Sequence, residues 1–186
     1  MKKSSSIKKP TAKELQSKIK SLKSEIIETY IAQGIDEYID VAVEKTQERF
    51  TRVRNPDGPD KGIGKYLLVI AITAKKEEVS VPVSVASSKK TTGFVYHIEG
   101  TAPGFISTAE VSCQGKDVSQ VTLGTILYCK IPAGKTATFR VQVEITGGIS
   151  KTYRVFINRI NYKLNLLDTR YRKFLPDIRT QPLEFY

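Results

Sequence analysis

Few residues in this sequence have types and spacings that could support catalysis. The 186 residues include one histidine, two cysteines and no tryptophan. His97 follows Tyr96 in a stretch typical of a strand, and no motif places a nucleophile and an orienting acid beside it. We therefore expect an imidazole at a strand surface, and we predict a non-enzymatic protein with no catalytic residue.

The two cysteines leave two alternatives open. Cys113 shares the strand parity of Val111, and Cys129 shares that of Leu127 and Ile131, so both thiols are expected to point inward. They form either a disulfide between strands or sheets, or two buried thiols that pack as small apolar groups. With a single histidine they cannot complete a tetrahedral zinc site, and we predict no metal and no cofactor.

Residues 55–64 are typical of a loop because they are rich in Gly, Pro, Asn and Asp. Three side chains with oxygen ligands surround Gly58, namely Asn55, Asp57 and Asp60. Their spacing lacks the calcium-binding EF-hand pattern, so a turn-forming role is favoured. The sequence Gly62-Ile63-Gly64 precedes a predicted strand instead of following one, which argues against a dinucleotide-binding loop.

The net charge of +11, from 30 basic and 19 acidic residues, lies mainly at the two ends. Residues 1–25 hold eight Lys and two acids, and residues 159–186 hold six basic and three acidic residues. Such arms either grip nucleic acid or an anionic surface, or only keep the chain soluble. The candidate phosphate contacts are Lys2, Lys3, Lys8, Lys9, Arg170, Arg172 and Lys173.

The N-terminal segment has the pattern of an amphipathic helix. Thr11 and Glu14 have the spacing of a capping box, and Gly34 is placed to end the helix. The apolar stripe consists of Leu15, Ile19, Leu22 and Ile26. This stripe either packs on the protein's own β-domain or mediates assembly with another subunit.

Residues 35–53 fit two patterns. Ile39, Val43 and Phe50 lie on a helical stripe, and Glu48 and Arg52 have the spacing of a helical charge pair. Alternation from Ile39 to Val43 would instead suit a strand. We predict a helix because the helical pattern lasts longer.

From Lys65 onward the apolar period is two, which indicates strands. The clearest one alternates from Phe139 to Ile145, and another alternates from Val79 to Val85, with Pro82 expected at a sheet edge. Further strands are predicted at 92–99, 107–113, 118–123, 126–131 and 151–165, the last with a bulge near Asn158. Residues 66–72 are apolar on both parities, so we expect both faces of that strand to be covered, one of them by the N-terminal helices.

The segment 131–143 begins with Ile131-Pro132-Ala133-Gly134-Lys135-Thr136-Ala137-Thr138-Phe139. It resembles the Pro-Ala-Gly-x-Thr-Ala-Thr-hydrophobic hairpin of bacterial immunoglobulin-like surface modules. The resemblance implies a Greek-key sandwich of seven or more strands that serves display or adhesion.

The C-terminal tail, residues 166–186, interleaves cations with aromatic rings. The candidate contacts for assembly or partners there are Tyr171, Phe174, Phe185 and Tyr186. Three roles remain open: stacking on nucleic-acid bases, adding as a strand to a neighbouring subunit, and packing on its own domain.

These observations predict a mainly β protein, an antiparallel immunoglobulin-like or jelly-roll-like β-sandwich with an N-terminal helical extension. We divide it into a basic helical extension (1–54), a linker loop (55–64), a β-sandwich domain (65–165) and the tail. The predicted function is a structural or interaction subunit, as in a surface appendage or particle shell. The alternative is a nucleic-acid-binding or capsid-like protein that uses its Lys-rich arm. Neither a signal peptide nor a membrane span is recognised, which favours an intracellular or particle-associated location.

Overall fold

The computed structural model describes residues 38–86, 92–100, 105–165, 170–175 and 178–186. Within these ranges the chain forms strands and no helix, so the protein is mainly β, as predicted. The strands are β1 (Ile39–Val53), β2 (Lys61–Ala74), β3 (Val79–Pro82), β4 (Val85–Ala86), β5 (Phe94–Gly100), β6 (Ile106–Gln114), β7 (Ser119–Leu123), β8 (Ile126–Ile131), β9 (Thr136–Gly148), β10 (Lys151–Leu164), β11 (Arg170–Phe174) and β12 (Leu183–Phe185). The helix predicted from Thr11 onward lies outside the described residues. None of the described residues belongs to a helix able to cross a membrane.

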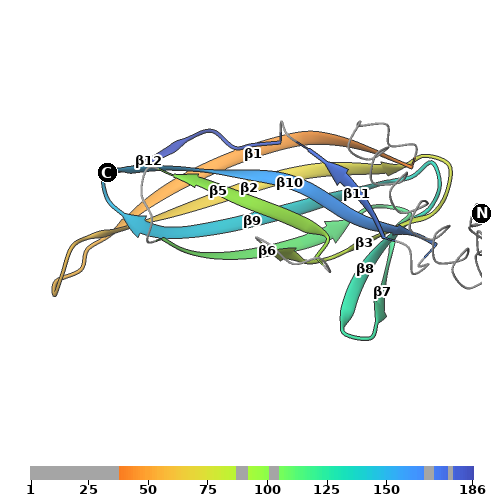
Figure 1. The fold of residues 1–186 in the computed structure, drawn as a ribbon, viewed down its shortest axis with the longest axis horizontal. Helices are drawn as coiled ribbons and strands as arrows, with labels where there is room; N and C mark the ends of the chain where they lie inside the picture. The colour runs from red at the N-terminus through yellow and green to blue at the C-terminus, as the bar shows by residue number, and fades with distance from the viewer. Residues whose placement is uncertain (1–37, 87–91, 101–104, 166–169, 176–177) are drawn as a thin grey trace, which may run out of the picture.

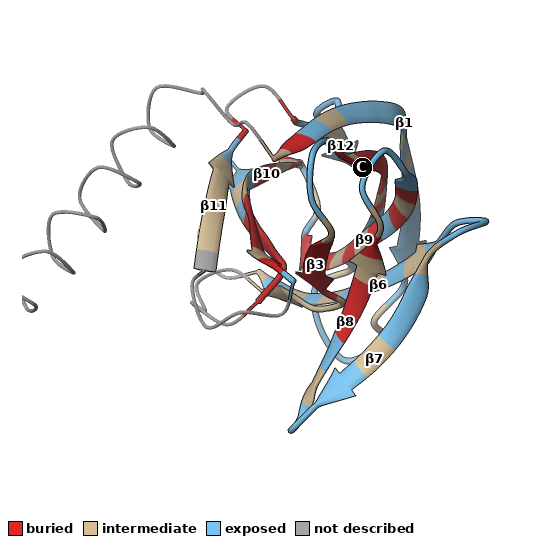
Figure 2. Ribbon diagram, turned by 90° about the vertical axis from the view of Figure 1, so that its right-hand side faces the viewer, coloured by how far each residue is buried: buried red, intermediate tan, exposed pale blue. Residues whose placement is uncertain are grey.

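The strands form two sheets that lie face to face (Figures 1 and 2). Sheet A has the order β1-β2-β9-β6, and sheet B has the order β4-β5-β10-β3-β8-β7. All pairings are antiparallel except that of β4 with β5. β11 and β12 both pair with β10, so the C-terminal residues extend sheet B along this long strand.

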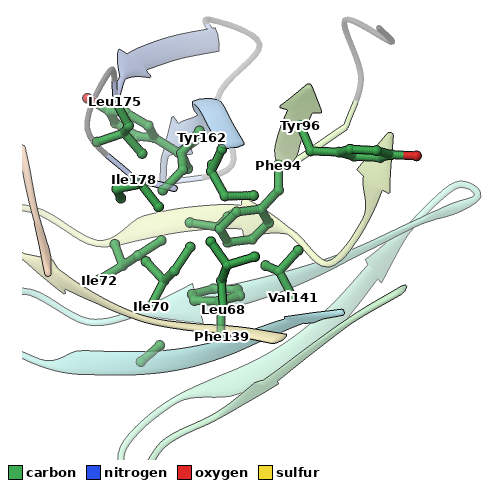
Figure 3. Close-up of a cluster of buried hydrophobic side chains, with 14 of the residues drawn as sticks. Leu68, Ile70, Ile72, Phe94, Tyr96, Phe139, Val141, Tyr162, Leu175 and Ile178 are labelled. Atoms are coloured by element: carbon green, nitrogen blue, oxygen red, sulfur yellow. The ribbon is translucent and has the colours of Figure 1, made fainter. Parts of the chain in front are cut away.

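The core lies between the sheets and is built from alternate residues of each strand. In β9 these are Ala137, Phe139, Val141, Val143 and Ile145, all fully buried, which confirms the strand predicted there. Figure 3 shows residues of β2 and β9 meeting Phe94 and Tyr162 of sheet B. Burial of this continuous apolar layer is the main force that holds the two sheets together.

The helix predicted for residues 35–53 is wrong where the structure describes it, because β1 runs from Ile39 to Val53. A bulge between Val43 and Lys45 changes the parity of the inward-facing residues. Inward positions therefore fall at 39, 41 and 43 before the bulge and at 46, 48 and 50 after it. The steps from 39 to 43, 46 and 50 imitate helical spacing.

The β-strands therefore begin well before residue 65, and the loop between β1 and β2 is shorter than the predicted linker of residues 55–64. Lys61 already belongs to β2, so only the turn between β1 and β2 remains as loop. The predicted pair of Glu48 with Arg52 does not form. Glu48 accepts a hydrogen bond from the backbone of Gln181 at 2.9 Å, and Arg52 pairs with Asp60 at 2.8 Å.

The strands predicted between 92 and 165 are confirmed, with ends that differ by at most three residues. The bulge near Asn158 is also confirmed, because the register of β10 with β5 shifts between Ile157 and Arg159. The edge position of Pro82 is wrong, since β3 lies between β10 and β8. Pro82 is tolerated there because β10 pairs only with Val79 and Ser80, so no partner requires a donor at position 82.

Both faces of β2 are covered at its centre, as its composition predicted. Leu68, Ile70 and Ile72 point into the core, and Val69 and Ala71 on the opposite face are also buried. Val69 lies between Lys45 of β1 and Arg140 of β9 in the sheet register. Neighbouring side chains of the same sheet are thus in place to shield this face, and the predicted helical cover lies outside the described residues.

Residues 132–135 form a turn between the two sheets, so the segment 131–143 is not a paired hairpin. β8 belongs to sheet B and β9 to sheet A, and the two strands do not pair with each other. The turn is closed by a hydrogen bond from the Lys135 amide to the Pro132 carbonyl at 3.0 Å. Gly134 has a φ of 73°, a conformation that favours glycine at this position.

Candidate functional site

The predicted contact residues of the N-terminal segment lie outside the described residues. This applies to the apolar stripe of Leu15, Ile19, Leu22 and Ile26 and to the basic residues Lys2, Lys3, Lys8 and Lys9. The candidate contact residues that the structure does describe lie in the C-terminal tail and on the surfaces of the two sheets.

We call residues 170–175 and 178–186 the C-terminal strap, because they run along one edge of β10. β11 pairs with residues 159–163, and β12 pairs with residues 151–153. Between them, the amide of Ile157 donates to the carbonyl of Ile178 and the amide of Thr180 donates to the carbonyl of Val155, each at 2.9 Å. Among the three roles left open by the sequence, the structure shows packing of the tail on its own domain.

Phe185 anchors the end of the strap in the core. Its side chain is fully buried, and its ring centroid lies 5.2 Å from that of Phe50 and 4.8 Å from that of Tyr153. A Cβ atom at Gly62 would lie 2.5 Å from the Phe185 ring, and one at Gly64 would lie 2.6 Å from it. These two glycines therefore provide the space for the ring.

The prediction that Phe185 contacts partners is consequently wrong for this structure, because the ring is covered by its own chain. No packing role was predicted from the sequence for Gly62 and Gly64. Two glycines at spacing i, i+2 in an otherwise apolar strand leave one face without side chains, and a bulky group can fill that face. The spacing of the two glycines was visible in the sequence, but it did not indicate that the Phe185 ring fills the space beside them.

Tyr171 and Lys173 connect the strap to the start of sheet A. The Tyr171 ring lies 5.3 Å from Tyr38 and 5.5 Å from Tyr162, measured between centroids. Burial raises the pKa of the Tyr171 hydroxyl above its ordinary value. The Lys173 ammonium group donates to the carbonyl oxygen of Ile39 at 2.9 Å, so it is engaged within the chain and not directed at phosphate.

The remaining tail candidates are at the surface. Phe174 is 43% exposed, Tyr186 is 71% exposed, and Arg172 is half-buried. Arg170 pairs with Lys163 through the backbone of β11, and its side chain is outside the described part. Phe174 and Tyr186 thus remain exposed as candidate contact residues.

The structure joins Cys113 of β6 and Cys129 of β8 in a disulfide, which resolves the two alternatives left by the sequence. The bond links sheet A to sheet B at the base of the β7–β8 hairpin. Cys129 is fully buried and Cys113 is half-buried. The bond closes a segment with a sequence separation of 16 residues.

Loss of this bond should destabilise the protein substantially. We expect replacement of Cys113 with serine, or reduction, to lower the free energy of unfolding by about 3 kcal/mol, because the open chain regains loop entropy. Urea denaturation with and without a thiol reductant measures the difference. The Cys113→Ser variant is the control, since reductant should leave its unfolding midpoint unchanged. An equal midpoint for the oxidised and reduced parent protein contradicts the expectation.

The β7–β8 hairpin is a surface that the sequence analysis did not identify. It stands out from the body of the molecule, and its burial decreases toward the tip (Figures 1 and 2). Leu123 is 44% exposed and Leu127 is 36% exposed. Leu127 was expected to point inward with Cys129, but the hairpin extends beyond the edge of the opposite sheet, so alternation alone gave the wrong result.

The polar groups of the β1–β2 turn are engaged with one another. Arg52 donates two hydrogen bonds to Asp60, at 2.8 and 3.0 Å, and this contact holds the pKa of Asp60 below its ordinary value. The Asn55 side chain accepts from the Asp57 amide at 3.4 Å. These contacts represent the turn-forming role favoured from the sequence. Among the described residues, no group of three His, Cys, Asp or Glu side chains could hold a metal ion.

Within the described part of the chain, neither His97 nor the pocket beside the β1–β2 turn has a nucleophile and a base next to each other. His97 is exposed on β5, and its ring lies 6.2 Å from that of Phe156. A surface pocket of about 540 Å³ lies beside the β1–β2 turn, where Arg52 and Asp60 already form an ion pair and Lys61 adds a third charge. Its other lining groups are small or apolar, including Ile106 and Gly147. We therefore consider the exposed surfaces of the two sheets and of the β7–β8 hairpin as candidate binding sites for macromolecules.

Comparisons with known proteins add no further identification. No protein-family model, curated protein or solved structure gives a significant match to this chain.

Proposed function

We propose that this protein is a non-enzymatic structural or interaction subunit, as in a surface appendage or particle shell. The two-sheet body is the rigid block, and segments at its margins make the contacts. One observation carries the proposal: the β7–β8 hairpin projects from the body and exposes Leu123 and Leu127 near its tip.

The position of this hairpin supports a role in assembly. β7 is the last strand of sheet B, so one side of its backbone has no strand partner within the described residues. Exposed edge strands with apolar side chains tend to pair with another chain, and native proteins usually protect them. The disulfide at Cys129 fixes the base of the hairpin to sheet A, which holds this edge in a defined direction. We propose a second copy of the chain as its partner.

The finer features of the predicted architecture form part of the same proposal. An immunoglobulin-like or jelly-roll-like topology would place contact loops at both ends of a rigid sandwich. The sharp turn at Pro132 and Gly134, which carries the chain from sheet B to sheet A, supports this description. Residues 1–33, with the stripe that includes Leu15 and Ile26, would supply a second contact between subunits.

Substitution of both hairpin leucines should weaken self-association. For Leu123→Asn together with Leu127→Asn, we expect the dissociation constant to rise about tenfold or more, because one apolar side chain on each face of the hairpin loses burial against the partner. Multi-angle light scattering over a concentration series gives the association state of the full-length protein. Thermal unfolding checks that the fold is retained.

Val53 provides a matched control. It is 41% exposed near the tip of the other long hairpin, β1–β2, so Val53→Asn removes an exposed apolar side chain comparable in exposed fraction to either hairpin leucine. This variant should associate like the parent protein. A parent protein that stays monomeric at every concentration, or an equal effect of Val53→Asn, would argue against the hairpin as the contact.

A further inference from the structure

The outer face of sheet B carries arginines and aromatic rings from several segments that are far apart in the sequence. We call this surface the arginine face. Its members are His97 of β5, Arg154, Phe156 and Arg159 of β10, Arg172 and Phe174 of β11, and Arg179. None of these residues belongs to the Lys-rich arm or to the β7–β8 hairpin.

The strand register brings these residues together. Phe156 stands opposite His97 on one side and Arg179 on the other. Arg159 stands opposite Phe174 of β11. The bulge between Ile157 and Arg159 is essential to this arrangement. Without it, a residue three positions after Phe156 would face the core, because side chains alternate along a strand.

The electrostatics of the surface favour an anionic ligand. Arg154 forms an ion pair with Glu99, and Glu184 lies at one end of the surface, opposite Thr152. Arg159 has no acidic partner among the described residues, and its buried Nε atom has no hydrogen-bond partner. Burial, and then the nearby charge of Arg172, lower the pKa of Arg159 below the ordinary value for arginine. Cations gathered in this way attract anions, which would stabilise them.

The exposed rings restrict the kind of anion. Phe174 is 43% exposed, His97 is exposed, and Phe156 is half-buried beneath the Arg154 guanidinium group, 4.9 Å from the ring centroid. Aromatic rings on a sheet surface, with cations beside them, can stack on unpaired bases while arginines bind phosphates. A duplex hides its bases from such rings, and an acidic peptide has no bases to stack.

We propose that the arginine face binds single-stranded nucleic acid, with Arg159, Arg172 and Arg179 at the phosphates and with Phe174 and His97 against the bases. Arginine suits this role because its planar guanidinium group donates two parallel hydrogen bonds to one phosphate. The site requires neither self-association nor the Lys-rich arm.

Fluorescence anisotropy of labelled oligothymidine and oligouridine with the full-length protein tests the proposal. The Arg159→Gln and Arg179→Gln double variant should bind about tenfold or more weakly, since two charge-assisted contacts are lost. The slope of log affinity against log salt should decrease in magnitude by about 1.4, at roughly 0.7 for each phosphate contact on a single strand. Phe174→Ala should reduce affinity at least about fivefold with little change of that slope.

Three controls separate this site from general attraction to a protein of charge +11. Arg140→Gln removes an exposed arginine from the outer face of sheet A, and it should bind like the parent protein. Tyr186→Ala removes an exposed ring outside the arginine face, and it should also leave binding unchanged. Replacing Lys2, Lys3, Lys8 and Lys9 with glutamine weakens any contribution of the arm, but it should leave the effect of the arginine variant intact.

Several results would overturn the proposal. These are no binding by the parent protein at low salt, an equal loss for Arg140→Gln, or a salt response that disappears with the arm substitutions alone. Binding of duplex DNA or polyglutamate as tightly as oligothymidine, with no effect of Phe174→Ala, would identify another polyanion as the ligand. Circular dichroism melting of each variant shows whether a lost signal reflects unfolding.

Discussion

Replacement of Phe185 with alanine should lower the free energy of unfolding by about 3 to 5 kcal/mol. The ring is fully buried between Phe50 and Tyr153, and it rests on Gly62 and Gly64 of β2. Its removal leaves a cavity that glycine neighbours cannot fill with side chains. The loss should also loosen the strap, because β12 holds only three paired residues on β10. Chemical denaturation measured by circular dichroism determines the change.

Tyr186 serves as the matched control for this substitution. It is the next residue and also aromatic, but it is 71% exposed and its ring contacts only Phe50 among the aromatic pairs described, with centroids 4.9 Å apart, so Tyr186→Ala should lower the free energy of unfolding by only about 1 kcal/mol. Gly64→Ala should also lower the free energy of unfolding, but by less than Phe185→Ala. Its Cβ would lie 2.6 Å from the Phe185 ring and would push the ring out of its place. If Phe185→Ala unfolds at the same denaturant concentration as the parent protein, the strap is not anchored as the structure indicates.

Replacement of Gly93 with alanine should be similarly damaging, with a loss of about 3 kcal/mol or more. A Cβ atom at this position would lie 1.8 Å from the carbonyl oxygen of Pro82. Backbone atoms must move to relieve this contact, whereas a flexible side chain could rotate away. Gly93 is also held on both sides, because its amide donates to the Ser84 hydroxyl at 3.2 Å and its carbonyl accepts from Asn161 at 2.7 Å.

Gly148→Ala is the comparison for this second substitution. Nothing lies within 4 Å of a Cβ atom at Gly148, and the residue is exposed at the end of β9. We expect this variant to match the parent protein or to gain a few tenths of a kcal/mol from a less flexible unfolded chain. Thermal and urea unfolding of both variants provide the measurement. Equal stability of Gly93→Ala and Gly148→Ala would show that β3 and β5 do not approach as closely as described.

The strands could be predicted because their signal is local. Alternation in β9 and in β10 depends only on the direction of successive Cβ atoms, and a change of parity even located the bulge near Asn158. The same reasoning failed for β1, where the bulge after Val43 converted a strand pattern into an apparent helical one. It also failed for Leu127, whose burial depends on how far the opposite sheet extends.

The candidate contact surfaces were less accessible to the sequence. The sequence showed the mixture of cations and aromatic rings in the tail. However, a strand that pairs within its own sheet has the same residue pattern as a strand that pairs with a neighbouring subunit, so the pattern could not distinguish the two. The structure therefore reassigned Phe185 and Lys173 to internal contacts and left Phe174 exposed. Nothing in the sequence placed Arg159 and Arg179 on one surface, since only the pairing of β10 with the strap puts Arg159 opposite Phe174 and Arg179 opposite Phe156.

By itself, the sequence determined that the chain is rich in β-strands, that its ends are basic and that both cysteines should point inward. These features follow from composition and from the alternation of residues that are close together in the chain. The tertiary structure alone decided which strands pair, that Cys113 meets Cys129, and that the tail closes over β10 onto Gly62 and Gly64. The physical reason is that pairing and burial depend on the shape of distant surfaces. A local pattern states which face of a strand avoids water, but it does not state what covers that face.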